Sequence, residues 1–259
     1  GQLFPYEVVN RYFQIINASP LKPQPDPLLE AQWKTALDEG RKMGDFSRTL
    51  VMVDSSGSMW FGEPQPMLIS FALGILISEL SSGQFKHKVL TFETTPQFHN
   101  VDGVSLLDKM QSLLRMRVGG STNLDAAMLL ILQVAKKRRL SPSQMPNRLV
   151  VVSDMQFDIA VRGQKGITLD VVDKRFKDAG YERPHVVFWN VQGSARDVQA
   201  QAGRRGVSLI SGFSTQTFQC VLAGQEVTPY TTMREAIDSP RYDGIRRRSQ
   251  GEILDCFIG

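Results

Sequence analysis

Oxygen-bearing side chains follow the most apolar stretches of this 259-residue sequence. Asp54, Ser56 and Ser58 come directly after one apolar run, and Asp154 comes directly after another. Thr122 stands in a glycine-containing loop at the start of a helical pattern. Two carboxylates and three hydroxyls, without histidine or cysteine, form a hard donor set of the kind that Mg²⁺ prefers, with Mn²⁺ or Ca²⁺ as substitutes. We therefore predict a metal site formed by these five side chains.

The spacing of the first three residues has a geometric reason. In a tight loop, residues two apart turn their side chains to the same side, so Asp54, Ser56 and Ser58 can face one point. Gly57 lets the backbone bend there without a Cβ clash. Taken alone, this loop is as typical of a turn with a serine helix cap. The metal interpretation is favoured because two further loops place oxygen-bearing residues in matching contexts.

Several neighbours of the five residues are further candidates. Ser121 competes with Thr122 as the ligand from the second loop, and Ser153 can orient a water on the metal. Asp158 is more typical of a surface turn. Supporting contacts to the ligands are the most that we expect from Ser55 and Asn123.

The charge of this donor set points to the kind of partner. Two carboxylates already neutralise a divalent cation. If Asp54 binds the ion directly and Asp154 binds it through water, the neutral hydroxyls leave the ion electrophilic. It then accepts an anionic ligand from outside, typically a carboxylate. The site therefore predicts metal-dependent capture of a protein partner through an Asp or Glu of that partner.

Short apolar runs alternate with helical patterns along most of the chain. This alternation predicts an α/β fold of three layers, in which helices cover both faces of a doubly wound, mostly parallel sheet. Ligand sites of such sheets lie at the carboxyl ends of the strands, where the oxygen-bearing residues stand. We expect strands at 49–53, 88–92, 148–153, 185–191 and 207–210, and helices at 66–80, 105–116, 123–138, 168–180 and 214–222.

The first residues differ from the rest because they contain no strand pattern. Pro5 can open a first helix, and Asp26 caps a second helix that Pro27 opens. We expect a short helical N-terminal arm at 1–44, the α/β domain at 45–225, and a C-terminal helix with a polar tail at 226–259.

The five candidate ligands resemble a known site. Asp54-x-Ser56-x-Ser58, Thr122 and Asp154 are similar to the metal-ion-dependent adhesion site (MIDAS) of von Willebrand factor A (vWA) domains. The order, the strand-then-loop context and the separations all fit. The resemblance implies a Rossmann-like, six-stranded sheet of order 3-2-1-4-5-6, with the site above strand 1.

Three further segments, 152–158, 187–190 and 211–214, resemble the uncharacterised DUF2828 family. Its members carry a helical region followed by an A domain. That layout is similar to the Ro-type RNA-binding autoantigens, in which helical repeats precede an A domain. The resemblance implies that the arm is the end of a helical region, most of which, including the part that carries RNA in Ro-type proteins, is absent from this sequence.

Composition excludes several classes of protein. An apolar content of 42% and a net charge of +4 exclude disorder as the main state. The longest apolar run, 67–77, is too short to span a bilayer, and the sequence shows no signal peptide. Cys220 and Cys256 cannot form a disulfide framework, which indicates a reducing compartment. We expect a cytoplasmic protein that does not bind membranes.

Two basic clusters, 136–139 and 246–248, are typical of solvated helix ends. They leave open an alternative function, in which the chain is a component of a Ro-like ribonucleoprotein and assists RNA binding. We do not expect an enzyme, because the sequence offers no general base beside the metal, no second metal cluster and no phosphate-binding lysine. His99 is the one base that we can nominate.

Overall fold

The computed structural model describes residues 3–18, 23–116, 123–154, 169–191 and 207–211. Its strands form one sheet with the spatial order β3-β2-β1-β4-β5-β6. All neighbouring strands run parallel except β2 and β3. The mostly parallel α/β sheet predicted from the sequence is therefore confirmed. The strands are β1 (Thr49–Val53), β2 (Lys88–Thr91), β3 (Phe98–Asn100), β4 (Arg148–Ser153), β5 (His185–Asn190) and β6 (Val207–Ser211).

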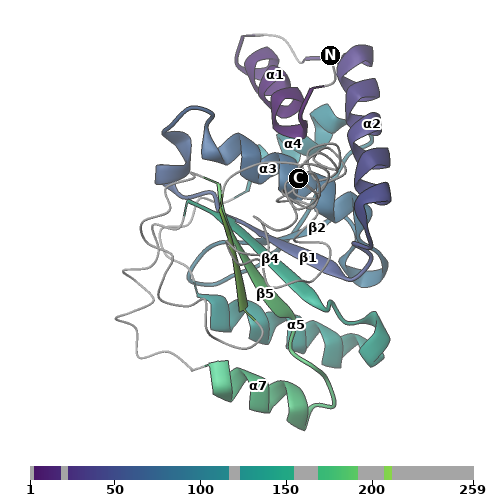
Figure 1. The fold of residues 1–259 in the computed structure, drawn as a ribbon, viewed down its shortest axis with the longest axis vertical. Helices are drawn as coiled ribbons and strands as arrows, with labels where there is room; N and C mark the ends of the chain where they lie inside the picture. Colours follow the sequence, from purple (N-terminus) through teal and green to yellow (C-terminus); the bar gives the residue numbers. More distant parts are fainter. Residues whose placement is uncertain (1–2, 19–22, 117–122, 155–168, 192–206, 212–259) are drawn as a thin grey trace, which may run out of the picture.

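Helices cover both faces of this sheet (Figure 1). Successive residues of a strand point to opposite faces, and all five residues of β1 are buried because both faces are covered. Val51 and Val53 pack with α1 to α4, whereas Leu50 and Met52 pack with α5 and α7. The helices are α1 (Pro5–Ala18), α2 (Pro27–Met43), α3 (Pro66–Leu80), α4 (Leu106–Leu114), α5 (Leu124–Arg138) and α7 (Leu169–Asp178), with short 3-10 turns η1 (Gly57–Trp60), η2 (Gly83–Phe85) and η3 (Pro142–Gln144).

Local sequence signals set the helix ends. Asp26 caps α2 by accepting hydrogen bonds from the N–H groups of Leu28 and Leu29 at 2.8 and 3.1 Å, as predicted. Ser105 and Asp108 form a reciprocal capping box at the start of α4. The helix predicted at 123–138 begins one residue later, at Leu124, because Asn123 is its N-cap and accepts at Oδ1 from Ala126 N at 2.9 Å.

Strand β3 was missed by the sequence patterns. It has only three residues, pairs antiparallel with β2 at the edge of the sheet, and contains no fully buried residue. A strand that short, with one neighbour, lacks the apolar run on which the other strand predictions relied. The predicted helix at 214–222, the 226–259 tail and both cysteines lie outside the described residues.

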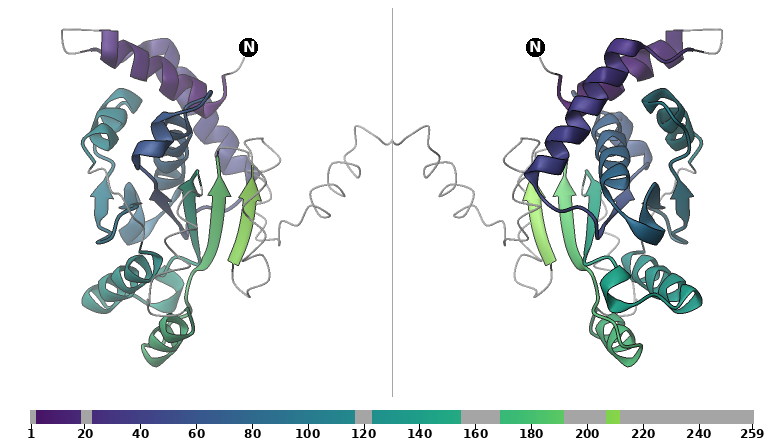
Figure 2. Two further views of the ribbon diagram at one scale, coloured as in Figure 1. Left: turned by 90° about the vertical axis from the view of Figure 1, so that its left-hand side faces the viewer. Right: turned by 90° about the vertical axis from the view of Figure 1, so that its right-hand side faces the viewer.

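Helix α3 lies at the centre of one helical layer. Every residue from Pro66 to Ser78 is buried, because β1 covers one side of the helix while α1, α2 and α4 cover the others. Figure 2 shows α1 and α2 crossing over the side of the sheet that α3 covers. Gly74 allows α3 to lie directly against β1, since a Cβ at this position would lie 2.7 Å from Cγ2 of Val53. The arm therefore shares the core of the α/β domain.

A carboxylate fixes the arm to the domain. Glu30 of α2 accepts a hydrogen bond from the Tyr12 hydroxyl at 2.6 Å. Its two oxygens also accept from the N–H of Leu106, at the start of α4, at 3.1 and 3.0 Å. A carboxylate is favourable at a helix N-terminus. Burial, and then the hydrogen bond to Glu30, raise the pKa of Tyr12, so this hydroxyl remains a donor at neutral pH.

Two charged side chains form a second tie inside the helical layer. Glu79 of α3 accepts from Lys109 of α4 at 2.9 Å and from the indole N–H of Trp33 of α2 at 2.9 Å. The side chain of Glu79 is only 11% exposed and that of Lys109 only 9%. The pairing compensates for burial of the two charges and links three helices. No described helix is long and apolar enough to cross a membrane.

We expect Glu30→Ala to lower the free energy of unfolding by about 2 kcal/mol, because the Leu106 N–H loses its acceptor and the Tyr12 hydroxyl keeps only the Asp26 carbonyl, at 3.3 Å. Urea unfolding followed by circular dichroism measures this loss. Glu39→Ala is the matched control on the same helix, since Glu39 makes only an exposed ion pair with Lys42, and we expect a loss below about 0.5 kcal/mol. Equal losses in the two variants would contradict the role given to Glu30.

Candidate functional site

Two buried carboxylates lie at the carboxyl ends of the two central strands. Asp54 follows β1 and Asp154 follows β4, and these strands are parallel neighbours. The backbone N–H of Asp54 donates to Val152 O at 3.1 Å, so pairing of the two strands continues into the site. Asp54 is 1% exposed and Asp154 is 5% exposed. Carboxylates are rarely buried to this degree without compensating partners.

The Asp54 carboxylate is held at both oxygens. Its Oδ1 accepts from the backbone N–H of Ser56 at 2.8 Å, and its Oδ2 accepts from the Ser153 hydroxyl at 2.5 Å. Ser70 of α3 donates to the backbone carbonyl of Asp54 at 3.4 Å. Each carboxylate oxygen has two lone pairs, so these bonds fix the side chain and leave acceptor capacity. The sequence analysis gave Ser153 the task of orienting a water, whereas its hydroxyl bonds directly to Asp54.

The two serines of the loop lie beside each other. The Oγ atoms of Ser56 and Ser58 are 3.2 Å apart, and both residues are partly buried. Ser56 immediately precedes the 3-10 turn η1, but its side chain makes no capping hydrogen bond there. The structure therefore shows the turn of the alternative interpretation, with Ser56 at the N-cap position of η1, but not a capping hydrogen bond from its side chain. The hydroxyls of Ser56 and Ser58 lie in the same loop as Asp54 and can serve as metal ligands.

Negative charge is costly at this position. Burial is the main cause that raises the pKa of Asp54, and the nearby charge of Asp154 adds to it. The hydrogen bonds from Ser153 and Ser56 act in the opposite direction. Asp154 has interactions of its own, yet its Oδ2 is buried and makes no hydrogen bond to any described residue. A cation between these acids would offset the cost of their burial.

The donor set fits a hard divalent cation. Nowhere in the described ranges do three or more His, Cys, Asp or Glu side chains gather in a way that could hold a metal ion. A metal at this edge of the sheet would therefore depend on hydroxyl ligands as well as the two acids. The Asp54, Ser56 and Ser58 loop supplies such hydroxyls, and these oxygen donors suit Mg²⁺.

Part of the predicted ligand set lies outside the described residues. These positions are Thr122, its competitor Ser121, and Asp158. Of the two residues that we expected to support the ligands, Ser55 is buried next to Asp54, whereas Asn123 caps α5.

Sequence reasoning missed several polar residues at the same sheet edge. Thr91 ends β2 and donates to Glu93 Oε1 at 2.7 Å. Asn190 ends β5, pairs in register with Ser153, and is 2% exposed. Their position at the carboxyl ends of strands adjoining β1 and β4 was the available signal. It was not used because neither residue belongs to the MIDAS pattern.

All three histidines lie away from the candidate site formed by Asp54, Ser56, Ser58 and Asp154, which we call the Asp54 cluster. His87 precedes β2 and His185 begins β5, so both are at the amino ends of parallel strands. His99 lies in edge strand β3, separated from β1 by β2, and its Nε2 is 3.1 Å from the Ser112 hydroxyl. The histidine that the sequence analysis nominated as a base is thus not brought to the site.

One described protein family matches most of this chain. A family model described as a domain of unknown function, DUF7788, matches residues 48–250. The chain belongs to the DUF7788 family. The match does not support the expected assignment to DUF2828, which rested on three short segments. The DUF7788 chain is also 31% identical over 235 residues to the uncharacterised protein L728 of Acanthamoeba polyphaga mimivirus, covering 90% of the chain but only 39% of that protein.

One solved structure shares the fold of the DUF7788 chain. The Ro (RSR) protein of Deinococcus radiodurans matches with a TM-score of 0.55 at 17% identity, covering 88% of this chain and 45% of that one. At this identity the match shows the fold alone. The VWA domain of SpRpn10 matches with a TM-score of 0.30 at 14% identity, over 74% of this chain and 94% of that one.

We expect Asp54→Asn to be no less stable than the parent in the presence of EDTA, with a gain of up to about 2 kcal/mol. The amide keeps an acceptor for the Ser56 N–H, donates an N–H to the Ser153 hydroxyl in place of the bond that Ser153 donates, and carries no buried charge beside Asp154. Urea unfolding at pH 7 measures the change. Asp102→Asn is the control, because Asp102 is exposed, and its effect should stay within about 0.5 kcal/mol. A loss of several kcal/mol in Asp54→Asn would show that the carboxylate is there for stability.

Proposed function

We propose that this DUF7788 protein is a vWA-like interaction module that binds Mg²⁺ at a MIDAS-type site and captures an acidic residue of a protein partner. The observation that carries the proposal is the pair of buried carboxylates at the ends of β1 and β4, beside two adjacent serine hydroxyls. The shared fold with the Ro (RSR) protein supports a doubly wound scaffold for such a site.

Asp54, Ser56, Ser58 and Asp154 would hold the ion, and Thr122 would complete the set from the loop before α5. Ser153 and the Ser56 N–H fix the rotamer of Asp54 before any ion arrives, which lowers the cost of ordering the site. Bound Mg²⁺ would supply a positive centre for an incoming carboxylate. The residues of the chain therefore position the ion and leave the anionic ligand to the partner.

Binding rather than catalysis is the function that these residues support. The Asp54 cluster contains acceptors and hydroxyls, while the histidines of the chain lie elsewhere in the fold. General acid–base catalysis needs a titratable group within hydrogen-bond reach of the substrate. The two acids would be engaged in holding the ion.

Mg²⁺ binding is the first test of the proposal. At about 100 times its Kd, Mg²⁺ should stabilise the parent by about 2.7 kcal/mol, which a thermal melt detects as a raised Tm. Asp54→Asn and Thr122→Ala should lose this rise, while Asp102→Asn should keep it. An unchanged rise in both site variants would refute the metal site. Partner capture from solution should likewise require Mg²⁺ and fail in EDTA.

A second candidate function has its own observation. Residues 136–139, Lys-Lys-Arg-Arg, are all exposed at the end of α5, on the face of the sheet opposite the arm. This basic surface supports the alternative of a ribonucleoprotein component that contacts RNA phosphates.

If this alternative holds, labelled single-stranded RNA should bind at low salt, and log K should fall steeply with log salt concentration. Replacing Lys136, Lys137 and Arg138 by alanine should reduce the slope by about 2, because each phosphate contact on a single strand contributes roughly 0.7. Fluorescence anisotropy measures both quantities. Absence of binding at low salt would remove RNA from the functions of this chain.

A further inference from the structure

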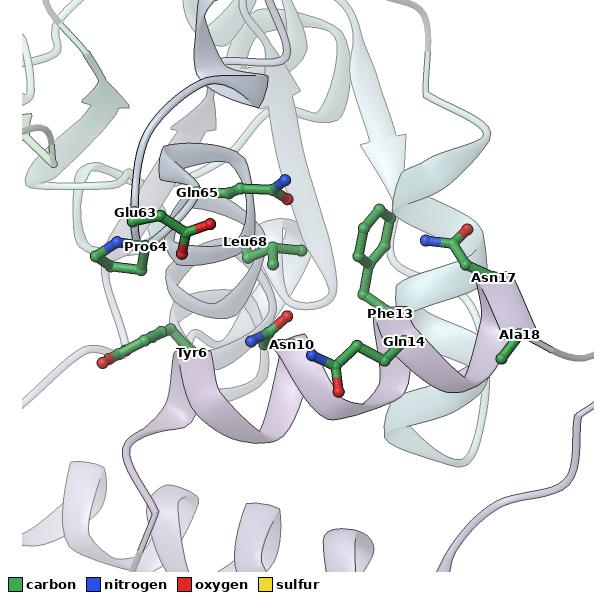
Figure 3. Close-up of a pocket in the computed structure, with 10 residues that line it drawn as sticks. All are labelled: Tyr6, Asn10, Phe13, Gln14, Asn17, Ala18, Glu63, Pro64, Gln65 and Leu68. Atoms are coloured by element: carbon green, nitrogen blue, oxygen red, sulfur yellow. The ribbon is translucent and has the colours of Figure 1, made fainter.

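A polar pocket of about 520 Å³ lies between α1 and the loop that leads into α3 (Figure 3). It is separate from the Asp54 cluster, although the same loop carries both, with Glu63 following Ser58 by five residues. The arm supplies Tyr6, Asn10 and Phe13 to its wall, and the loop supplies Glu63 and Gln65. The pocket thus exists because the arm packs against the domain.

The polar lining of this pocket offers both acceptors and donors: Glu63 accepts only, and the amides of Asn10, Gln14, Asn17 and Gln65 each have an oxygen and an NH2 group. Figure 3 shows Glu63, Gln65 and Asn10 around the same pocket, with Asn10 on α1 and the other two on the loop before α3. Oε1 of Gln65 is buried and accepts no hydrogen bond from any described residue, so it offers a position for a donor on a ligand. Glu63 is the only charged side chain among the described residues that line the pocket. The described lining contains no Lys or Arg that would attract an anion. The charge of the pocket therefore favours a cation.

Aromatic rings complete the lining. Tyr6 and Phe13 lie on the same face of α1 as Asn10, and Phe13 packs against Trp60 with ring centroids 5.6 Å apart. A cation over an aromatic face is attracted by the ring quadrupole, most often in the case of a guanidinium. A guanidinium is planar and carries five N–H donors, which matches a carboxylate and amide oxygens set beside aromatic rings.

We infer that this pocket binds an arginine side chain of a protein partner. Glu63 pairs with the guanidinium, Gln65 and Asn10 accept its remaining N–H groups, and Phe13 lies against its plane. Only the assignment of the arginine to a protein partner rests on the proposed function. In that function, the loop between β1 and α3 would hold Mg²⁺ near its start and the pocket near its end, so one protein partner would contact both. Arginine binding itself uses none of the metal ligands and is independent of Mg²⁺.

The test uses the full chain and the peptide acetyl-Gly-Arg-Gly-amide, titrated by calorimetry in EDTA. The matched peptide carries citrulline, which has the same shape and no charge. We expect the arginine peptide to bind at least about tenfold more tightly than the citrulline peptide, since hydrogen bonds to charged groups are the stronger ones. Glu63→Gln and Gln65→Met should each weaken arginine binding by about tenfold. Glu182→Gln, an exposed glutamate outside the pocket, should leave it unchanged.

Three outcomes would overturn the inference: no binding of the arginine peptide to the parent, equal binding of the two peptides, or unchanged binding in Glu63→Gln. Preferential binding of a nucleoside such as uridine would overturn it as well. Because Glu63 is exposed, its variant should fold, which circular dichroism verifies. Arginine binding in a chain that shows no Mg²⁺-dependent rise in Tm would leave this inference intact while the proposed metal site fails.

Discussion

Helix α3 imposes the constraint on which the rest of the structure depends. Its residues are buried from Pro66 to Ser78, so it cannot stand on the surface of a sheet as an amphipathic helix does. The sheet covers one side, and α1, α2 and α4 must cover the others. Two carboxylates of this layer, Glu30 and Glu79, follow from that arrangement, because each satisfies donors from helices that meet around α3.

The same helix positions the candidate site. Gly74 brings α3 against Val53, the last residue of β1, and Ser70 one turn earlier donates to the carbonyl of Asp54. The loop between β1 and α3 is therefore fixed at both ends by packed elements. Within it, the carboxylate of Asp54 is buried at an electrostatic cost that its hydrogen bonds reduce only in part. Sites that keep such a cost are commonly the ones that bind or react.

The sequence predicted those parts of the fold that depend on local patterns. Strands buried on both faces are continuous apolar runs, which made β1 and β4 recognisable, and Asp26 with Pro27 marked the start of α2. The Asp54 loop could be placed because parallel strands end at one edge. Tertiary relations were beyond reach: β3 is defined by its pairing with β2, and the Glu30 bond to Leu106 joins residues 76 positions apart. The role of Ser153 depends on the register between β1 and β4, which no spacing in the sequence reveals.

The burial of α3 also means that the family match and the packed core begin at different residues. The family match begins at residue 48, after the arm. Yet Val8, Val9 and Tyr12 of the arm are inaccessible to solvent and belong to the same apolar cluster as α3. The segment that the family model matches is therefore smaller than the segment that forms the core, and α1 and α2 are structural components of this domain.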